Sequence, residues 1–210
     1  MTGLHDVVVP LGGPVAGLRD EVFAAASWRA LAPLLASIKF ARLSPDGGVS
    51  FPAGKHFQRV LRGDGLDLPA DPATITTGNI LGEGALLVGD FDVAKAAAKG
   101  AVDPVAQVAL EAARFVALVE RCGGRAIHDT SPSGGRHVYV RFARSRPWPV
   151  LQQIALALAR RFGSFDAGPM RTPQGQIRPP GAPHKRTVTV MAKGKRGGHR
   201  LTGALTGYLT

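Results

Sequence analysis

The order of the predicted secondary-structure elements constrains the fold of this chain more than any other sequence feature. Hydrophobic periodicity between residues 85 and 190 predicts a strand, a helix, two strands, a helix and a strand. The strands are expected at 85–88, 125–129, 137–142 and 188–190, and the helices at 103–122 and 147–162. This order is typical of a split βαβ, or RRM-like, sheet with its helices on one face. We therefore predict an α+β fold whose other sheet face is available for a site.

Both helices carry apolar residues at helical spacing. In the first, Asp103 and Pro104 supply an N-cap and a first turn. Pro147 opens the second, and the residues expected on its buried face are Val150, Ile154, Leu158 and Phe162. A further helix is predicted at 20–36, before a stretch at 38–80 in which short apolar pieces alternate with turn signals.

The net charge of +11 is unevenly distributed along the chain. Residues 1–129 contain 12 Lys and Arg against 14 Asp and Glu, whereas residues 130–210 contain 14 Lys and Arg and a single carboxylate, Asp166. Such asymmetry indicates a polyanionic partner, nucleic acid or nucleotide. An exposed basic tail that only aids solubility is the alternative explanation.

Composition excludes several other kinds of protein. The single cysteine, Cys122, can form neither a disulfide framework nor a cysteine-based zinc site, so no zinc is expected. This cysteine usage fits a cytoplasmic location. No membrane partner is expected, because no segment is long and apolar enough to cross a bilayer and the N-terminus lacks the pattern of a signal peptide.

The first chemical motif, Gly89-Asp90-Phe91-Asp92, follows directly on the apolar run at 85–88. Alternate residues of a strand share a face, so Asp90 and Asp92 are expected to point the same way. Paired carboxylates repel each other unless a cation lies between them, and their oxygens suit Mg²⁺ or Mn²⁺. A strand that ends in a polar turn is the structural alternative.

The second motif is a glycine-containing loop at 131–135 followed by the strand at 137–142. Backbone N–H groups of such a loop can cradle phosphate. On the strand, His137, Tyr139 and Arg141 share one face, where His137 and Arg141 could donate hydrogen bonds to triphosphate oxygens. A hairpin loop with a surface histidine fits the same pattern. The candidate nucleotide-binding residues of this motif are Ser133, Gly134, Arg136 and His137.

The third motif combines Asp166 with the proline-rich segment at 175–185. Asp166 could complete a three-carboxylate metal site, and Arg178, with His184 or Lys185, could clamp phosphates. The prolines of this segment would keep it stiff, which helps to position a side chain. The structural alternatives are a turn residue for Asp166 and a surface ion pair for Arg178.

Together, and in this order, the three motifs resemble those of the archaeo-eukaryotic primase superfamily, and most closely the primase-polymerase domains of phage and plasmid replication proteins. That family has an apolar strand ending in a DxD-like pair, a glycine loop before a strand-borne histidine, and a further acid with an IRxPGxxHK-like segment. The matching positions here are Asp90 and Asp92, Ser133 to His137, and Asp166 with Ile177 to Lys185. The resemblance covers about residues 85–201 and departs from the family at Gly135, where a small hydroxyl residue is frequent.

The resemblance implies an RRM-like catalytic core at 81–210, with a basic C-terminal segment, and a smaller N-terminal α/β module at 1–80 packed on it. It implies a template-directed DNA primase or polymerase, in which a 3′-hydroxyl attacks the α-phosphate of a nucleotide. Asp90, Asp92 and Asp166 would be catalytic and would hold two divalent ions, Mg²⁺ or Mn²⁺. His137 and Arg178 would bind the triphosphate. The residues expected to contact nucleic acid are Arg141, Lys193, Lys195, Arg196 and Arg200.

The implied partners are a single-stranded DNA template, NTP or dNTP substrates, and a replicative helicase on another segment or protein, all in the cytoplasm of a bacterial host cell. The main alternative is a non-catalytic basic module for DNA binding or origin recognition, which explains the charge but not the three acids. A rolling-circle nickase needs paired histidines on one strand and a nucleophilic tyrosine. This chain has only Tyr139 and Tyr208, and His137 has no partner histidine two residues away. A primase-like domain that has lost activity also fits the sequence.

Overall fold

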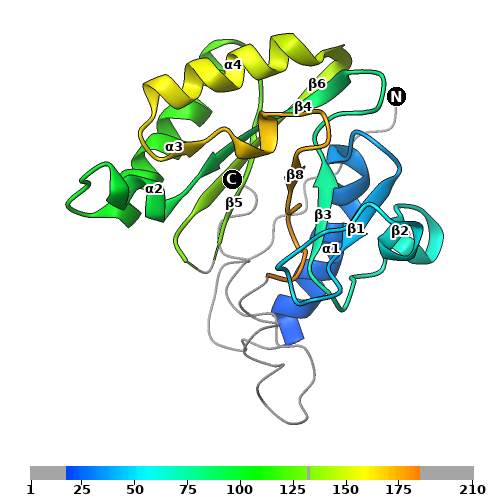
Figure 1. The fold of residues 1–210 in the computed structure, drawn as a ribbon. Helices are drawn as coiled ribbons and strands as arrows, with labels where there is room; N and C mark the ends of the chain where they lie inside the picture. The colour runs from blue at the N-terminus through cyan, green and yellow to red at the C-terminus, as the bar shows by residue number, and fades with distance from the viewer. Residues whose placement is uncertain (1–17, 132, 185–210) are drawn as a thin grey trace.

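The computed structural model describes residues 18–131 and 133–184, which form an α+β structure with two antiparallel sheets (Figure 1). The helices in these ranges are α1 (Leu18–Leu35), α2 (Val93–Ala98), α3 (Pro104–Arg121) and α4 (Trp148–Arg161). The strands are β1 (Phe40–Leu43), β2 (Gln58–Val60), β3 (Ala73–Thr76), β4 (Glu83–Phe91), β5 (Ile127–Thr130), β6 (Arg136–Pro147), β7 (Phe165–Asp166) and β8 (Gln176–Ile177). None of the helices described could span a bilayer.

The larger sheet has the strand order β5-β6-β4-β7, with every neighbouring pair antiparallel. Along the chain its elements run β4, α3, β5, β6, α4, β7, so the predicted succession of strands and helices is present, with the short α2 added after β4. The last strand was predicted at 188–190, which lies outside the described residues. The strand that follows α4 is instead β7, and its two residues are too few to give a periodic signal.

One face of this sheet is covered by α3 and α4 (Figure 1). Aromatic rings make much of the contact. Phe91 of β4 lies 6.1 Å from Phe115 of α3, 5.9 Å from Phe162 and 5.4 Å from Phe165, measured between ring centroids. Gly89 is on the same face, where a Cβ would come within 2.9 Å of the Phe115 ring. Because side chains alternate along a strand, Asp90 points to the opposite face.

The buried face of α4 differs from the prediction. Val150 and Ile154 were expected in the core, but they are 49% and 37% exposed. The buried positions are Trp148, Leu151, Ala155 and Leu158, a 3-4-3 spacing that begins at the tryptophan. The indole of Trp148 fits against two glycines, Gly78 and Gly84, where added Cβ atoms would lie 2.8 Å and 3.3 Å from its ring. The contact of Trp148 with these glycines fixes the rotation of the helix about its axis. Helical spacing in the sequence does not reveal it, because it is a tertiary contact.

The smaller sheet has the order β2-β1-β3-β8 and lies beside α1 (Figure 1). Its strand β8 comes from the C-terminal half, so the predicted division at residue 80 separates stretches of chain that share this sheet; the division itself stays a prediction. Buried residues of both sheets form one continuous core. The loop after β8 contacts α1 closely at Gly181, which has φ +84° and where a Cβ would lie 2.3 Å from the Ala24 carbonyl oxygen.

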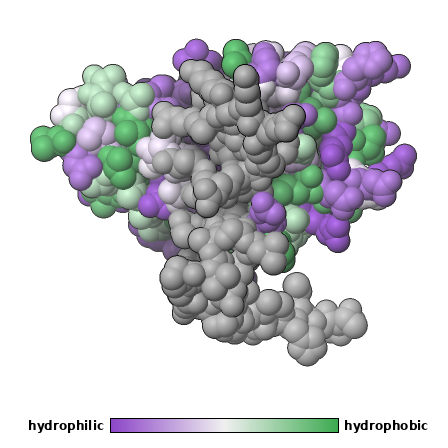
Figure 2. Space-filling model, turned by 90° about the horizontal axis from the view of Figure 1, so that it is seen from below, coloured by the Kyte–Doolittle hydropathy of each residue, from purple (hydrophilic) through white to green (hydrophobic). Residues whose placement is uncertain are grey.

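Polar and apolar surface separate on the face shown in Figure 2. Hydrophobic residues gather there over α2 and the start of α3, where Val102 is fully exposed and Val105 is 47% exposed. Hydrophilic residues gather over the β1–β2 side of the smaller sheet. The smaller sheet therefore presents a polar outer surface and packs its apolar face on the common core.

A buried carboxylate, Glu111 of α3, fixes the turn that leads into β7. Its oxygens accept hydrogen bonds from the backbone N–H groups of Gly163 (3.1 Å) and Ser164 (2.8 Å) and from the Ser164 hydroxyl (2.6 Å). The Ser164 carbonyl in turn accepts from the Asp92 N–H at 2.8 Å. Burial alone raises the pKa of Glu111, but these hydrogen bonds outweigh it and the pKa is lowered.

Replacing Glu111 by Gln should destabilise the protein by about 1–3 kcal/mol at neutral pH, because it removes charge-assisted hydrogen bonds to a buried turn. A lowered folded-state pKa stabilises the fold above the unfolded pKa, and this stability is lost as the pH falls through the folded value. The difference in melting temperature between wild type and Glu111→Gln should therefore shrink below pH 4.5, the ordinary pKa of this carboxyl. A difference that stays constant down to pH 3 would contradict this role.

Candidate functional site

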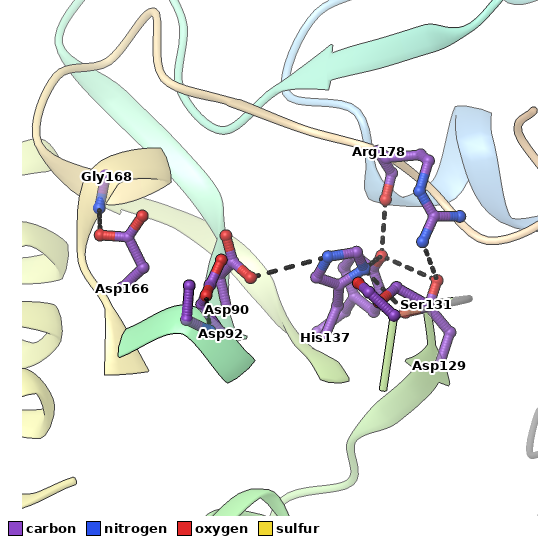
Figure 3. Close-up of polar contacts among 11 residues, drawn as sticks. Asp90, Asp92, Asp129, Ser131, His137, Asp166, Gly168 and Arg178 are labelled. Carbon is purple, nitrogen blue, oxygen red and sulfur yellow. Dashed lines mark hydrogen bonds and ion pairs between the residues drawn. The ribbon is translucent and has the colours of Figure 1, made fainter. Parts of the chain in front are cut away.

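Four titratable side chains form a row across the larger sheet, on the face away from α3 and α4. Strand pairing places Asp129 of β5 opposite His137 of β6, His137 opposite Asp90 of β4, and Asp90 opposite Asp166 of β7. Residues directly opposite each other in antiparallel strands present their side chains on the same face. Figure 3 shows the four in this order, from Asp166 to Asp129. The register therefore brings together acids and a histidine that are up to 76 positions apart in the sequence.

At one end of the row, His137 lies between two carboxylates (Figure 3). Its Nδ1 is 2.7 Å from Asp129 Oδ1, and its Nε2 is 3.7 Å from Asp90 Oδ1. Burial alone lowers the pKa of His137, but the charges of Asp129 and Asp90 outweigh burial and raise it. Burial alone raises the pKa of Asp129, but the charges of His137 and Arg178 outweigh burial, and the pKa of Asp129 is lowered. The two carboxylates thus favour the protonated form of His137, and His137 with Arg178 favours the ionised form of Asp129.

The same buried carboxylate faces a second cation, Arg178. The Nη2 atom of Arg178 lies 3.9 Å from Asp129 Oδ2. This distance allows an ion pair but is too long for a hydrogen bond. The side chain is 10% exposed, and both of its terminal nitrogens are buried without a hydrogen-bond partner among the described residues. Buried guanidinium donors normally have acceptors, and these two nitrogens can take an anionic ligand as a partner.

Tyr139 connects the strand to the segment that carries Arg178. Its hydroxyl donates to the Arg178 carbonyl oxygen at 2.6 Å and also contacts Asp129 and His137. The ring is almost fully buried, so this part of the β6 face is covered and not open as the sequence suggested. Arg141, two residues further, donates to the carbonyl oxygens of Leu34 at the end of α1 and of Ala85. These contacts give Arg141 a structural role, and its contact with nucleic acid stays a prediction.

Asp90 occupies the middle of the row, opposite His137 on one side and Asp166 on the other. Burial raises its pKa; the His137 charge opposes this, and the neighbouring carboxylates of Asp166 and Asp92 raise the pKa further. A carboxylate in these surroundings is stabilised by any cation that approaches it.

The other two predicted metal ligands already have partners. Asp92 lies just past the end of β4 and not on it, and it caps α2 by accepting from the N–H groups of Ala94 (2.6 Å) and Lys95 (3.2 Å). Asp166 accepts from the Gly168 N–H at 3.1 Å and forms an ion pair of 2.9 Å with Lys95 Nζ. Both sets of contacts use Oδ1, so each residue has a second carboxylate oxygen for another role.

The donor chemistry of the row fits a divalent cation in part. Asp90 and Asp166 are hard oxygen donors held on opposing strand positions, and repulsion between them raises the pKa of Asp90. Within residues 18–131 and 133–184, however, no three His, Cys, Asp or Glu side chains are grouped so as to hold a metal ion. Mg²⁺ is commonly bound by one or two carboxylates together with substrate phosphates and water. Asp90 and Asp166 fit such a site as its two carboxylates, and Asp92 lies next to them just past the end of β4.

The glycine loop closes on itself beside the row. The Ser131 N–H donates to the Gly135 carbonyl oxygen at 2.8 Å, and the Gly134 N–H donates to that of Ser131 at 2.9 Å. Gly134 has φ +86°, which a residue with a side chain rarely adopts. Ser133 contacts the Ser131 hydroxyl, and Arg136 donates to Thr130. Two of the N–H groups expected to cradle phosphate are therefore used within the loop, and phosphate binding here stays a prediction.

The remaining predicted residues divide between described and undescribed parts of the chain. His184 is described and has an interaction partner. The basic residues predicted to bind phosphate or template at the C-terminal end are Lys185, Lys193, Lys195, Arg196 and Arg200, and all of them lie outside the described residues.

Sequence reasoning missed Asp129, the buried carboxylate that faces both cations. It had been taken only as the end of a strand. Its signal was indirect. The strands on the two sides of the glycine loop pair as a hairpin, and their register sets Asp129 opposite His137. Lys95 was also missed, since a lysine three residues after a DxD pair has no distinctive pattern.

Comparisons with known proteins add a weak structural likeness. No protein-family model matches the chain, and no curated protein matches it. Among solved structures, the chain is similar to the polymerase domain of ligase D from Mycobacterium tuberculosis, solved in complex with DNA. The TM-score is 0.48 and the identity 13%, over 76% of this chain and 73% of that one. A likeness of this degree carries no argument about function.

Replacing Asp129 by Asn should destabilise the fold strongly, by about 3–5 kcal/mol, because it leaves the buried charges of His137 and Arg178 without their counter-ion. Urea unfolding at pH 7 measures this loss. The matched control is Asp67→Asn, since Asp67 pairs with Arg29 at 2.8 Å but both side chains are more than 60% exposed. Exposed pairs contribute little, so the control should unfold almost like wild type. Equal effects of the two substitutions would contradict the role assigned to Asp129.

Proposed function

We propose that this chain is the catalytic domain of a template-directed primase-polymerase, with β4 to β7 as an RRM-like catalytic sheet. The observation that carries the proposal is the row Asp129, His137, Asp90 and Asp166, which unites three motifs far apart in sequence on one sheet face. The chemistry of the row is asymmetric, with cations at the Asp129 end and paired carboxylates at the Asp166 end. This is the charge arrangement that a nucleotide triphosphate with a divalent ion requires.

The cationic end of the row binds the triphosphate. His137, whose pKa is raised, can donate from Nε2, which faces Asp90. Arg178 offers two buried terminal nitrogens that have no hydrogen-bond partner in the described chain. Asp129 lies 2.7 Å from His137 and 3.9 Å from Arg178 and fixes the position of both groups, so their donors are oriented before the ligand arrives. His184 and Lys185, with Ser133, Gly134 and Arg136, are proposed to complete the nucleotide site.

The carboxylate end holds the cation and the reacting atoms. Asp90 and Asp166, with Asp92 adjacent, would hold Mg²⁺ or Mn²⁺, which when bound lowers the charge on the phosphates and activates the attacking oxygen. In the proposed reaction a 3′-hydroxyl oxygen forms a bond to the α-phosphorus, the bond to the β-phosphate oxygen breaks, and pyrophosphate leaves. The hydroxyl proton passes to solvent. Template binding is assigned to the basic residues of the C-terminal segment.

Two other functions are less consistent with this geometry. A non-catalytic DNA-binding module would not need a buried, charge-compensated row of this kind. A nickase would need paired histidines on one strand and an accessible tyrosine. His137 has no partner histidine two residues away, and Tyr139, the one tyrosine among the described residues, is buried and donates to the Arg178 carbonyl oxygen. The proposed setting is replication in a bacterial cytoplasm, with a single-stranded DNA template and a helicase supplied by another segment or protein.

The proposal is tested by incubating the full chain with single-stranded DNA, labelled nucleotides and Mn²⁺ or Mg²⁺, with and without a primer. Wild type should make metal-dependent products, and Asp90→Asn should lower the rate by about a hundredfold or more, because it removes a charge at the reacting centre. The control is Asp103→Asn, which changes an exposed acid that caps α3 outside the row and should keep full activity. Equal activity of Asp90→Asn and wild type would sink the assignment.

A separate variant distinguishes the two roles open to Asp92. Asparagine caps a helix about as well as aspartate, so Asp92→Asn should keep α2 intact while it removes a negative charge from the site. If Asp92 helps to hold the cation, synthesis should fall by about tenfold or more with an unchanged melting temperature. Retained activity would restrict Asp92 to the capping role.

Arg178→Lys should raise the Michaelis constant for nucleotide by about tenfold, because lysine keeps the charge but loses the paired donors of the guanidinium. Steady-state kinetics at saturating template measure this change. An unchanged Michaelis constant would remove Arg178 from the nucleotide site.

A further inference from the structure

We propose that Lys95 is the resident counter-ion of the carboxylate site, and that its ammonium competes with the divalent cation for Asp166. The inference rests on the proposed function for the identity of the cation. It adds Lys95 to that site and specifies the order of binding. The Lys95 ammonium stays paired with Asp166 until nucleotide and metal bind together.

The geometry places Lys95 on the cation side of the row. Its Nζ lies 2.9 Å from Asp166 Oδ1, which belongs to the same carboxylate that the strand register sets opposite Asp90. The lysine is the third residue after Asp92, and its own backbone N–H donates to the Asp92 side chain. One short helical turn therefore links the DxD motif to a cation that neutralises the third acid of the site.

The ion pair is suited to displacement. The side chains of Lys95 and Asp166 are 43% and 33% exposed, so water screens their attraction. A divalent cation at Asp90 and Asp166 would carry twice the charge of the ammonium and would meet two carboxylates instead of one. A metal ion on the second Asp166 oxygen, Oδ2, would still bring two positive charges to one carboxylate, where they repel each other. Metal binding therefore favours release of the ammonium.

A nucleotide triphosphate makes this exchange favourable. Its phosphate oxygens supply the ligands that the described residues lack for a metal ion. They also give the displaced Lys95 ammonium a new anionic partner. Metal alone should thus bind weakly, whereas metal together with nucleotide should bind well.

The test measures Mn²⁺ binding to the full chain by the loss of the free-ion electron paramagnetic resonance signal, first without nucleotide. Lys95→Met should lower the Mn²⁺ dissociation constant by about fivefold, the size that a half-exposed ion pair supports. Lys95→Arg keeps the charge and should resemble wild type. Lys99→Met is the matched control, because Lys99 ends the same helix and has no ion pair within the described residues; it should leave the constant within about twofold.

Addition of a non-hydrolysable deoxynucleotide triphosphate gives the second measurement. It should strengthen Mn²⁺ binding by wild type far more than by Lys95→Met, so that the difference between the two proteins disappears or reverses. An unchanged or weaker affinity of Lys95→Met for Mn²⁺ alone would overturn the inference. The outcome is independent of catalysis: a fivefold gain in a protein that makes no product would keep the inference and reject the polymerase assignment.

Discussion

The pairing of β4 with a strand on each side is the constraint on which the site depends. Because β4 lies between β6 and β7, its residue Asp90 has His137 on one side and Asp166 on the other. A shift of one residue in either pairing would turn these side chains to the face that packs on α3 and α4. Phe91 prevents such a shift, since its ring is fully buried among Phe115, Phe162 and Phe165. Aromatic packing on one face thereby fixes the polar row on the other.

Charge compensation explains how this row can be partly buried. Asp129 is fully enclosed and is tolerated because His137 and Arg178 face it, while Lys95 neutralises Asp166 at the other end. Asp90 in the middle has His137 Nε2 at 3.7 Å, but burial and the neighbouring acids outweigh this contact and raise its pKa. Arg178 has buried donors without acceptors among the described residues. The charges of the site are therefore compensated except at Asp90, which favours a cation, and at Arg178, whose buried donors favour an anion.

The sequence predicted the elements of this sheet better than the details of its site. A short apolar run predicted β4, alternation predicted β6, and capping signals with helical spacing predicted α3 and α4, because these helices and β6 span enough residues for a period to appear. Strand β7 is too short for that, and Trp148, which sets the rotation of α4, acts through a tertiary contact with two glycines. Asp129 and Lys95 join the site through strand register and an ion pair, neither of which is encoded in local spacing.

The most direct test of the account is the position of a bound metal. A crystal of the full chain grown with Mn²⁺ and a non-hydrolysable deoxynucleotide triphosphate would locate the ion by its anomalous scattering. We expect Mn²⁺ between the carboxylates of Asp90 and Asp166, with the phosphates reaching His137 and Arg178 and the Lys95 ammonium released from Asp166. A metal–nucleotide complex bound elsewhere on the chain, with the Lys95–Asp166 pair intact, would contradict the account.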